Sequence, residues 1–182
     1  MRCQSPWSRH NRSILLSDIL KAMPITLRDY QPQDREQLTE LFDEFLRYLV
    51  VLDPLSRMRH TPGYESGVLD KDLQEVREHR GKFAVAVDGT TILGFVIGII
   101  QERKNQPDVI DFTAGRITEL YVDEAVRGQH IGTMLMEHIE AYFASQGCDT
   151  AKVEVFAPNA PARRLYEKFG YEWRDIDTIK KL

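Results

Sequence analysis

The sequence predicts an α+β fold: a mixed, mostly antiparallel twisted sheet of six to seven strands, flanked by four helices. Two kinds of hydrophobic periodicity support this prediction, because β-rich runs alternate along the chain with segments whose apolar residues recur at helical spacing. The first half contains a hairpin signal, Asp88-Gly89-Thr90, between two β-rich runs. The second half alternates strands with helices, which indicates crossover connections. A sheet that mixes hairpins and crossovers has helices on both faces.

The first half of the chain is predicted to place two helices between its strands. Ile25, Leu27 and Tyr30 form a short edge-strand pattern, which Pro32 ends. Asp34 and Gln37 then have the spacing of a capping box. The elements that follow are a helix whose apolar positions run from Leu38 to Leu49, a loop at 53–67, a polar surface helix at 69–78, and the hairpin strands 83–87 and 92–100.

The second half continues the same sheet. Residues 101–112 are polar and are predicted to form a long turn before a third β-rich run. Glycines at 147 and 170 end the two helices, as expected at helix C-termini. The elements predicted here are the strand 116–122, a helix at 131–143, a strand at 151–156, a helix at 162–169 and a last strand at 171–179.

Length, composition and cysteine content limit the class of protein. The chain has 182 residues, of which 42% are hydrophobic, enough for one domain with its own core. No uninterrupted apolar run is long enough to cross a membrane, so we expect no membrane partner. The two cysteines, Cys3 and Cys148, form neither a disulfide framework nor a zinc motif. We therefore expect a reducing, cytoplasmic location and no metal.

The net charge of −4 is unevenly distributed. Residues 1–23 contain four basic residues and one acidic residue, a charge of +3, so residues 24–182 carry −7. Nucleic-acid binding requires clustered Lys and Arg, which excludes a nucleic-acid partner for this acidic domain; it suits cationic partners instead. We expect residues 1–23 to be an N-terminal extension, with a targeting segment as the alternative, and residues 24–182 to be the domain.

The loop at residues 127–133 is the strongest local signal of a binding site. It connects a strand to the start of a helix, where unpaired backbone N–H groups and the helix dipole favour phosphate. The loop lacks the Gly-Lys-Ser/Thr of a nucleotide-triphosphate site. It also lacks the glycine spacing and the position of a dinucleotide fingerprint. A phosphate site and an ordinary strand–helix connection both remain open on the loop alone.

Two blocks of sequence resemble the GCN5-related N-acetyltransferases. In that family the central signature is Arg/Gln-x-x-Gly-x-Gly/Ala after a strand, and here Arg127-Gly128-Gln129-His130-Ile131-Gly132 follows the strand that ends at Val122. His130 replaces the first signature glycine, so it must tolerate the local backbone. The second block, residues 159–171, is similar to the family's Asn-x-x-Ala-x-x-x-Tyr-x-Lys-x-Gly-Phe segment. The resemblance covers residues 24–182.

The resemblance implies direct transfer of an acetyl group from acetyl-CoA to a primary amine of a small molecule or peptide. Glu119 is then the candidate general base, acting directly or through water, and Tyr166 the candidate general acid. The backbone of Leu120 and Val122 would pair with the two amides of the pantetheine arm. Arg127 would contact phosphate, and Asn159 would contact the CoA arm or cap its helix. The pyrophosphate would lie on the N–H groups of Gly128, Gln129, His130, Ile131, Gly132 and Thr133.

Each of these residues also has a structural interpretation. Glu119 could pair with a cation such as Arg116 across the sheet, Tyr166 could be a core residue on the apolar face of its helix, and Arg127 could be a solvated surface residue. At the level of function, the alternatives are acetylation of a protein N-terminus or lysine, and a CoA-binding module without catalysis. We expect the acceptor site to be formed by residues 45–70, the turn at 101–113 and the last strand; a homodimer is left open.

Overall fold

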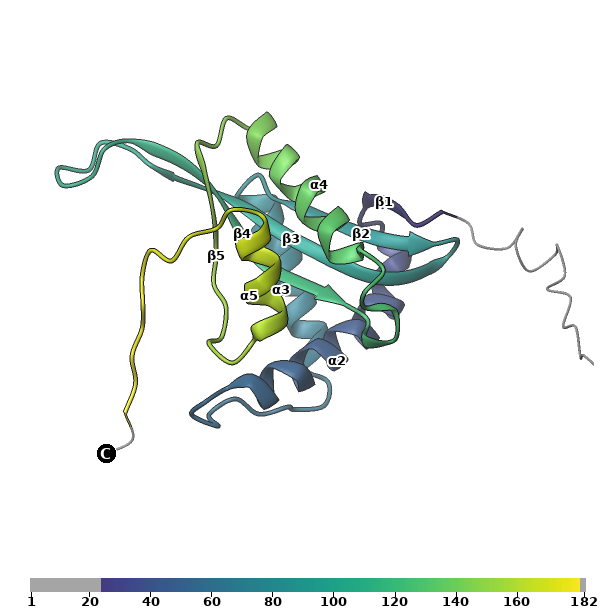
Figure 1. The fold of residues 1–182 in the computed structure, drawn as a ribbon. Coiled ribbons are helices and arrows are strands. Elements are labelled where there is room, and N and C mark those ends of the chain that lie inside the picture. The colour runs from purple at the N-terminus through teal and green to yellow at the C-terminus, as the bar shows by residue number, and fades with distance from the viewer. Residues whose placement is uncertain (1–23, 181–182) are drawn as a thin grey trace, which may run out of the picture.

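The computed structural model describes residues 24–180, so the predicted extension at 1–23 lies outside the described residues (Figure 1). Five strands form one sheet in the order β1-β2-β3-β4-β5, and four helices pack on it. The strands are β1 (Thr26–Asp29), β2 (Lys82–Asp88), β3 (Thr91–Arg103), β4 (Phe112–Val122) and β5 (Thr150–Val153). The helices are α2 (Arg35–Leu52), α3 (Tyr64–Glu78), α4 (Ile131–Ser145) and α5 (Ala160–Lys168), with short 3₁₀ turns at Pro32–Asp34 and Glu124–Val126.

The sheet is mixed and mostly antiparallel, as the sequence predicts. β1 to β4 pair antiparallel in chain order, and only β5 lies parallel, beside β4. The parallel pair follows from the crossover through α4, which returns the chain to the same end of the sheet. None of the helices in residues 24–180 is long and apolar enough to cross a membrane.

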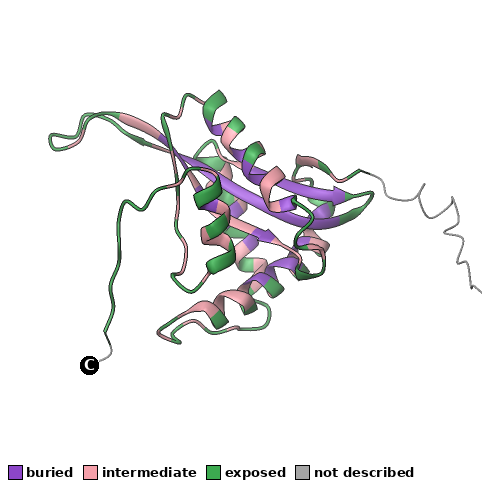
Figure 2. Ribbon diagram, viewed as in Figure 1, coloured by how far each residue is buried: buried purple, intermediate pink, exposed green. Residues whose placement is uncertain are grey.

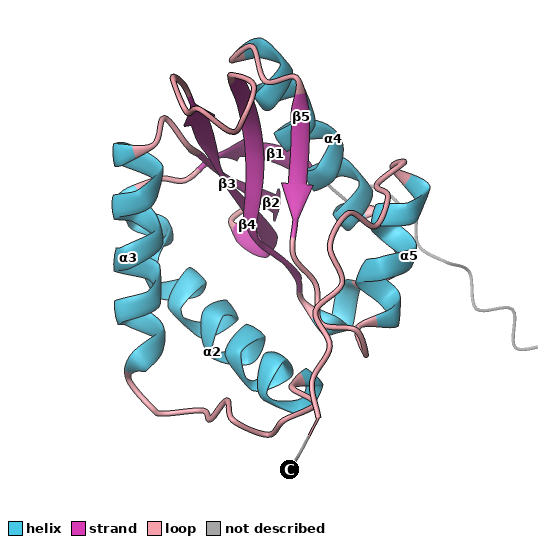
Figure 3. Ribbon diagram, turned by 90° about the vertical axis from the view of Figure 1, so that its left-hand side faces the viewer, coloured by secondary structure: helices cyan, strands magenta, loops and turns pink. Residues whose placement is uncertain are grey.

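The sheet separates two hydrophobic cores. Along β2, Phe83 and Val85 face α2 and α3, whereas Ala84 and Ala86 face α4. The first core is aromatic, and Phe42 of α2 stacks on the sheet's Phe95 with ring centroids 4.5 Å apart. Figure 3 shows α2 and α3 on one side of the sheet, with α4 and α5 on the other. Burial is concentrated in the central strands and on the helix faces toward them (Figure 2).

The predicted last strand, 171–179, is wrong. Residues 171–180 have no regular secondary structure, and the segment leaves the body of the protein after α5 (Figure 1). The described sheet therefore has five strands instead of six to seven. Trp173, Ile176 and Ile179 suggested a strand by residue type, but all three side chains are exposed. A β-rich composition produces a strand only where a neighbouring strand and a buried face are available.

Four element boundaries also differ from the prediction. α3 begins at Tyr64, not at residue 69, so the preceding loop is shorter. The sequence signal failed because Gly63 and Gly67 suggested a loop, whereas Gly63 occupies the N-cap with φ +84° and Gly67 is tolerated inside the helix. β3 extends to Arg103 and β4 already begins at Phe112, so both strands continue into the segment predicted as a long turn. A ladder of backbone hydrogen bonds pairs the polar residues there. β5 ends at Val153.

Candidate active site

A β-bulge in β4 determines which face each of its side chains occupies. Ile97 of β3 lies opposite Glu119, but the next residue of β3 lies opposite Ile117, so Thr118 has no partner. A bulge of this kind interrupts the alternation of side chains along a strand. Ile117 consequently packs in the core beneath α4, whereas Glu119 faces α2 and α3, on the same side as Tyr121.

β4 and β5 stop pairing at the bulge. Their parallel register joins Ala114–Ile117 to Thr150–Val153 and goes no further (Figure 3). Among the described strands, none pairs with residues 118–122 of β4 on the β5 side. An extended ligand can add to such an edge through backbone hydrogen bonds. The predicted pantetheine contacts, Leu120 and Val122, lie on this edge.

Glu119 is half-buried, and within residues 24–180 it forms no ion pair. Arg116, its alternative partner in the sequence interpretation, instead has a guanidinium nitrogen 3.6 Å from Glu154 Oε1. Burial raises the pKa of the Glu119 carboxyl from 4.5 to about 8, and the nearby carboxylate of Asp72 adds to this effect. A carboxyl group with this pKa exchanges protons near neutral pH, as a general base must.

Tyr166 is a core residue with a hydroxyl group that remains protonated. Its side chain is 8% exposed and packs in the core beneath α4, which confirms the position that helical periodicity predicted. Burial, together with the negative charge of Glu119, raises the pKa of Tyr166 to about 12. The phenol is therefore neutral at physiological pH and can donate a proton or hydrogen bond. The charge of Glu119 thus acts on Tyr166, although the two residues come from opposite faces of the sheet.

The loop between β4 and α4 exposes the backbone at the helix start. Gly128 has φ +86° and His130 has φ +63°, both in the left-handed region. His130 is the N-cap of α4, and its side chain forms no capping hydrogen bond. The first N–H groups of α4 are thus left for a ligand. All six predicted pyrophosphate contacts lie here: Gly128, Gln129, His130, Ile131, Gly132 and Thr133.

Arg127 and Asn159 both contact α2, which sequence reasoning did not predict. The Arg127 guanidinium carbon lies 5.0 Å from the ring centroid of Tyr48 and 5.5 Å from that of Tyr121. Its Nε donates to the carbonyl of Val122 at 3.1 Å. Asn159 caps α5 as predicted, and its Oδ1 also accepts a hydrogen bond from the Tyr48 hydroxyl at 3.1 Å. Tyr48 therefore connects α2 both to Arg127, in the loop before α4, and to Asn159, at the start of α5.

Asp72 is a residue of this region that the sequence analysis did not single out. α3 was predicted to be a polar surface helix, yet Asp72 is only 4% exposed, and its Oδ2 is buried with no hydrogen-bond partner. Burial raises the pKa of this carboxyl to about 6. The spacing of Leu69, Leu73 and Val76, which pack against the sheet, is the signal that places Asp72 on the inner face of α3.

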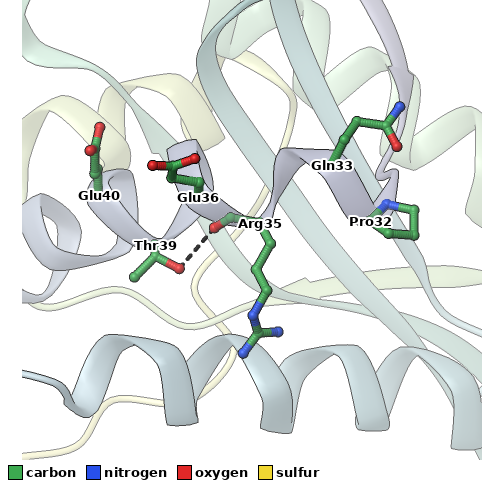
Figure 4. Close-up of a pocket in the computed structure, with 6 residues that line it drawn as sticks. All are labelled: Pro32, Gln33, Arg35, Glu36, Thr39 and Glu40. Carbon is green, nitrogen blue, oxygen red and sulfur yellow. Dashed lines mark hydrogen bonds between the residues drawn. The ribbon is translucent and has the colours of Figure 1, made fainter.

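Two other features of the described chain include none of the predicted catalytic or cofactor-binding residues. Asp43, His60 and Glu65 offer ligand atoms within 4.8 Å of one another, a group that could hold a metal ion, but the Asp43 carboxylate already bonds Arg47 and His60. An open hollow of about 530 Å³ lies at the start of α2 (Figure 4). It contains none of the predicted site residues; its lining is Pro32, Gln33, Arg35, Glu36, Thr39 and Glu40.

Comparison with known proteins identifies the family. A sequence model described as the acetyltransferase (GNAT) family matches residues 35–171. The chain belongs to this family. Among solved structures, the crystal structure of a mutant protein from Bacillus halodurans has a TM-score of 0.77 at 21% sequence identity, and the match covers 86% of this chain and 99% of that one. This likeness confirms the fold.

Two curated relatives are N-acetyltransferases or acetyltransferases by name. An uncharacterised N-acetyltransferase of Methanocaldococcus jannaschii is 30% identical over 95 residues, which are 52% of this chain and 54% of that protein. The mycothiol acetyltransferase of Brachybacterium faecium is 34% identical over 91 residues, 48% of this chain and 25% of the relative. This GNAT chain thus matches about half of the length of the first relative and a quarter of the length of the second.

Proposed function

We propose that this GNAT protein transfers an acetyl group from acetyl-CoA directly to the primary amine of a small molecule or peptide. One observation carries the proposal: Glu119, whose pKa burial raises to about 8, lies on β4 just beyond the point where β4 loses its β5 partner, and its charge raises the pKa of the Tyr166 phenol. A proton acceptor and a proton donor thus stand on either side of an unpaired strand edge. That arrangement suits an extended thioester ligand attacked by an amine.

The shape of the loop and strand edge supports acetyl-CoA as the donor. Leu120 and Val122 offer backbone groups that would pair with the pantetheine amides. The exposed N–H groups at the start of α4 would hold the pyrophosphate. Gly132 fits this role because a Cβ there would lie 3.3 Å from Leu165 Cδ2, so a larger side chain would crowd the helix start. Arg127 would reach phosphate only by leaving the Tyr48 and Tyr121 rings.

In the proposed reaction, Glu119 accepts a proton and Tyr166 donates one. Amines are mostly protonated at pH 7, so the Glu119 carboxylate takes a proton from the acceptor ammonium, directly or through water. The freed nitrogen lone pair forms the new bond to the thioester carbonyl carbon. The carbon–sulfur bond then breaks, and the Tyr166 hydroxyl donates its proton to the departing sulfur. The new amide nitrogen gives up its second proton, which restores the Tyr166 hydroxyl. Ionised Glu119 is required, so kcat/KM should rise with pH through about 8.

The proposal is tested in two stages with the full chain. Acetyl-CoA should first raise the melting temperature, because a ligand at a hundredfold excess over Kd stabilises the native state by about 2.7 kcal/mol. Release of CoA should then be followed with a panel of primary amines. A thermal shift without CoA release for any amine would favour the non-catalytic module, and no shift at all would overturn the donor assignment.

Variants separate the two catalytic roles. Glu119→Gln should lower turnover by about 10²–10⁴-fold, and raising the pH should partly restore it, because more acceptor is then already neutral. Tyr166→Phe should retain acetyl-CoA binding but lower kcat at every pH. Glu137→Gln, an exposed change on α4, is the matched control and should leave both parameters unchanged. If both site variants keep near-normal kcat, Glu119 and Tyr166 are structural residues.

A further inference from the structure

Asp72 of α3 and Glu119 of β4 are carboxyl groups on the facing surfaces of two layers of the fold, and the charge of Asp72 raises the pKa of Glu119. The bulge at Thr118 turns Glu119 toward α3, and the helical spacing of Leu69, Leu73 and Val76 turns Asp72 toward the sheet. Asp72 is 4% exposed, and no hydrogen bond reaches its Oδ2. A buried charged oxygen without a partner is costly, and each such group in a native protein requires an explanation.

The cations near this pair are already engaged elsewhere. Lys71 Nζ lies 3.4 Å from Glu75 Oε1, one turn along α3. Arg116 lies 3.6 Å from Glu154 Oε1, on the chain just beyond β5. Each of these pairs is close to electrically neutral. Within residues 24–180, neither Asp72 nor Glu119 forms an ion pair, although the charge of Lys71 lowers the pKa of both and that of Arg116 lowers the pKa of Glu119. The inner surface between α3 and β4 therefore carries two carboxyl groups without a bonded cation.

We propose that Asp72 is the counter-ion for the acceptor, and that the acceptor is an aliphatic amine that enters as its ammonium ion and has no carboxylate or phosphate beside the amine. This inference rests on the proposed function, because it takes Glu119 as the base. The Asp72 carboxylate would accept a hydrogen bond from the ammonium, supplying the partner that its Oδ2 lacks. An anionic group next to the amine would face the like charge of Asp72, which disfavours binding.

The same arrangement explains how a raised pKa is compatible with base catalysis. In the free protein, burial and Asp72 favour the protonated form of Glu119. An ammonium ion between the two carboxylates adds a positive charge and so favours ionised Glu119. The ammonium then gives one proton to Glu119, and Asp72 keeps its negative charge throughout. Binding of the cation thus prepares the base.

Matched acceptors test the selectivity. Agmatine, tyramine and putrescine differ from arginine, tyrosine and ornithine only in lacking the carboxylate beside one amine. We expect kcat/KM for each amine to exceed that of its amino acid by at least about tenfold, as for loss of one unfavourable charge contact. Asp72→Asn should raise KM for the amines by about tenfold or more and leave KM for acetyl-CoA unchanged. Glu78→Gln removes a carboxylate from an exposed position of the same helix and is the control.

Two further readouts distinguish a direct role from a structural one. Asp72→Asn should lower the apparent pKa on the acid side of the kcat/KM profile, because Asp72 raises the pKa of Glu119. Binding of the six acceptors is also measured by calorimetry with CoA present, without turnover. Amine binding that depends on Asp72 but gives no CoA release would support the acceptor assignment and overturn the proposed function. If the amino acids react faster than the amines, or if Asp72→Asn has the same KM for the amines as the unmodified chain, the role of Asp72 is overturned while the proposed function stands. If no acceptor binds or reacts, both the role of Asp72 and the proposed function are overturned.

Discussion

Replacing Glu119 by Gln should stabilise the folded protein in alkaline solution. The folded-state pKa of Glu119 is about 8, raised from an ordinary value of 4.5 by burial and by Asp72. Between these two values the folded state binds more protons than the unfolded state, so stability falls as pH rises. At about 1.4 kcal/mol per pKa unit, full ionisation opposes folding by about 5 kcal/mol. Contact of the half-buried carboxylate with water reduces this to about 2–4 kcal/mol.

Urea denaturation at pH 5, 7 and 9 measures this effect. Glu119→Gln should differ from the unmodified chain by less than about 1 kcal/mol at pH 5 and should be more stable by about 2–4 kcal/mol at pH 9. Glu137→Gln, on the exposed face of α4, should follow the unmodified chain at all three pH values. If the free energies of unfolding of Glu119→Gln and of the unmodified chain differ by the same amount at pH 5, 7 and 9, burial and Asp72 do not raise the pKa of Glu119, and the reasoning fails.

Two further predictions concern glycine positions and the loop before α4. Gly115→Ala should lower the melting temperature, with a loss of about 1–3 kcal/mol, because its Cβ would lie 2.2 Å from ring carbons of Phe143; an unchanged melting temperature would mean that the ring moves aside freely. His130→Gly should retain acetyl-CoA binding in calorimetry, since glycine adopts the φ of +63° without strain, whereas Gly132→Val should lose it. Equal losses would show that the imidazole itself contacts the ligand.

Most of the sheet and all four helices could be predicted from local patterns. Alternation is clear in Phe83–Val87 because successive side chains enter different cores, and the Asp88-Gly89 turn marks the hairpin directly. The predicted last strand failed for a different reason. Strand formation depends on a partner elsewhere in the fold, and residue types such as Trp173 and Ile176 report only local preference.

The candidate site was predicted in part. The signature residues around Arg127 and Tyr166 could be found because the two blocks are local in sequence. The role of Asp72 could not be found in this way, since its significance depends on a bulge 46 residues later that turns Glu119 toward it. Likewise, the aromatic contacts of Arg127 join α2 to the end of β4 through the tertiary fold. Interactions between distant segments leave little trace in a single sequence.

The unpaired Thr118 also has a practical consequence for engineering the acceptor preference of this protein. Positions on β4 cannot be chosen by counting every second residue, because the count changes sides at Thr118. Arg116, Glu119 and Tyr121 share the surface toward α2 and α3, so mutant libraries aimed at the acceptor should sample these three positions. Libraries at Ile117 or Leu120 would instead alter the opposite core. Deleting Thr118 would remove the bulge and leave a regular strand, because Ile117 and Glu119 already face opposite surfaces and pair with consecutive residues of β3.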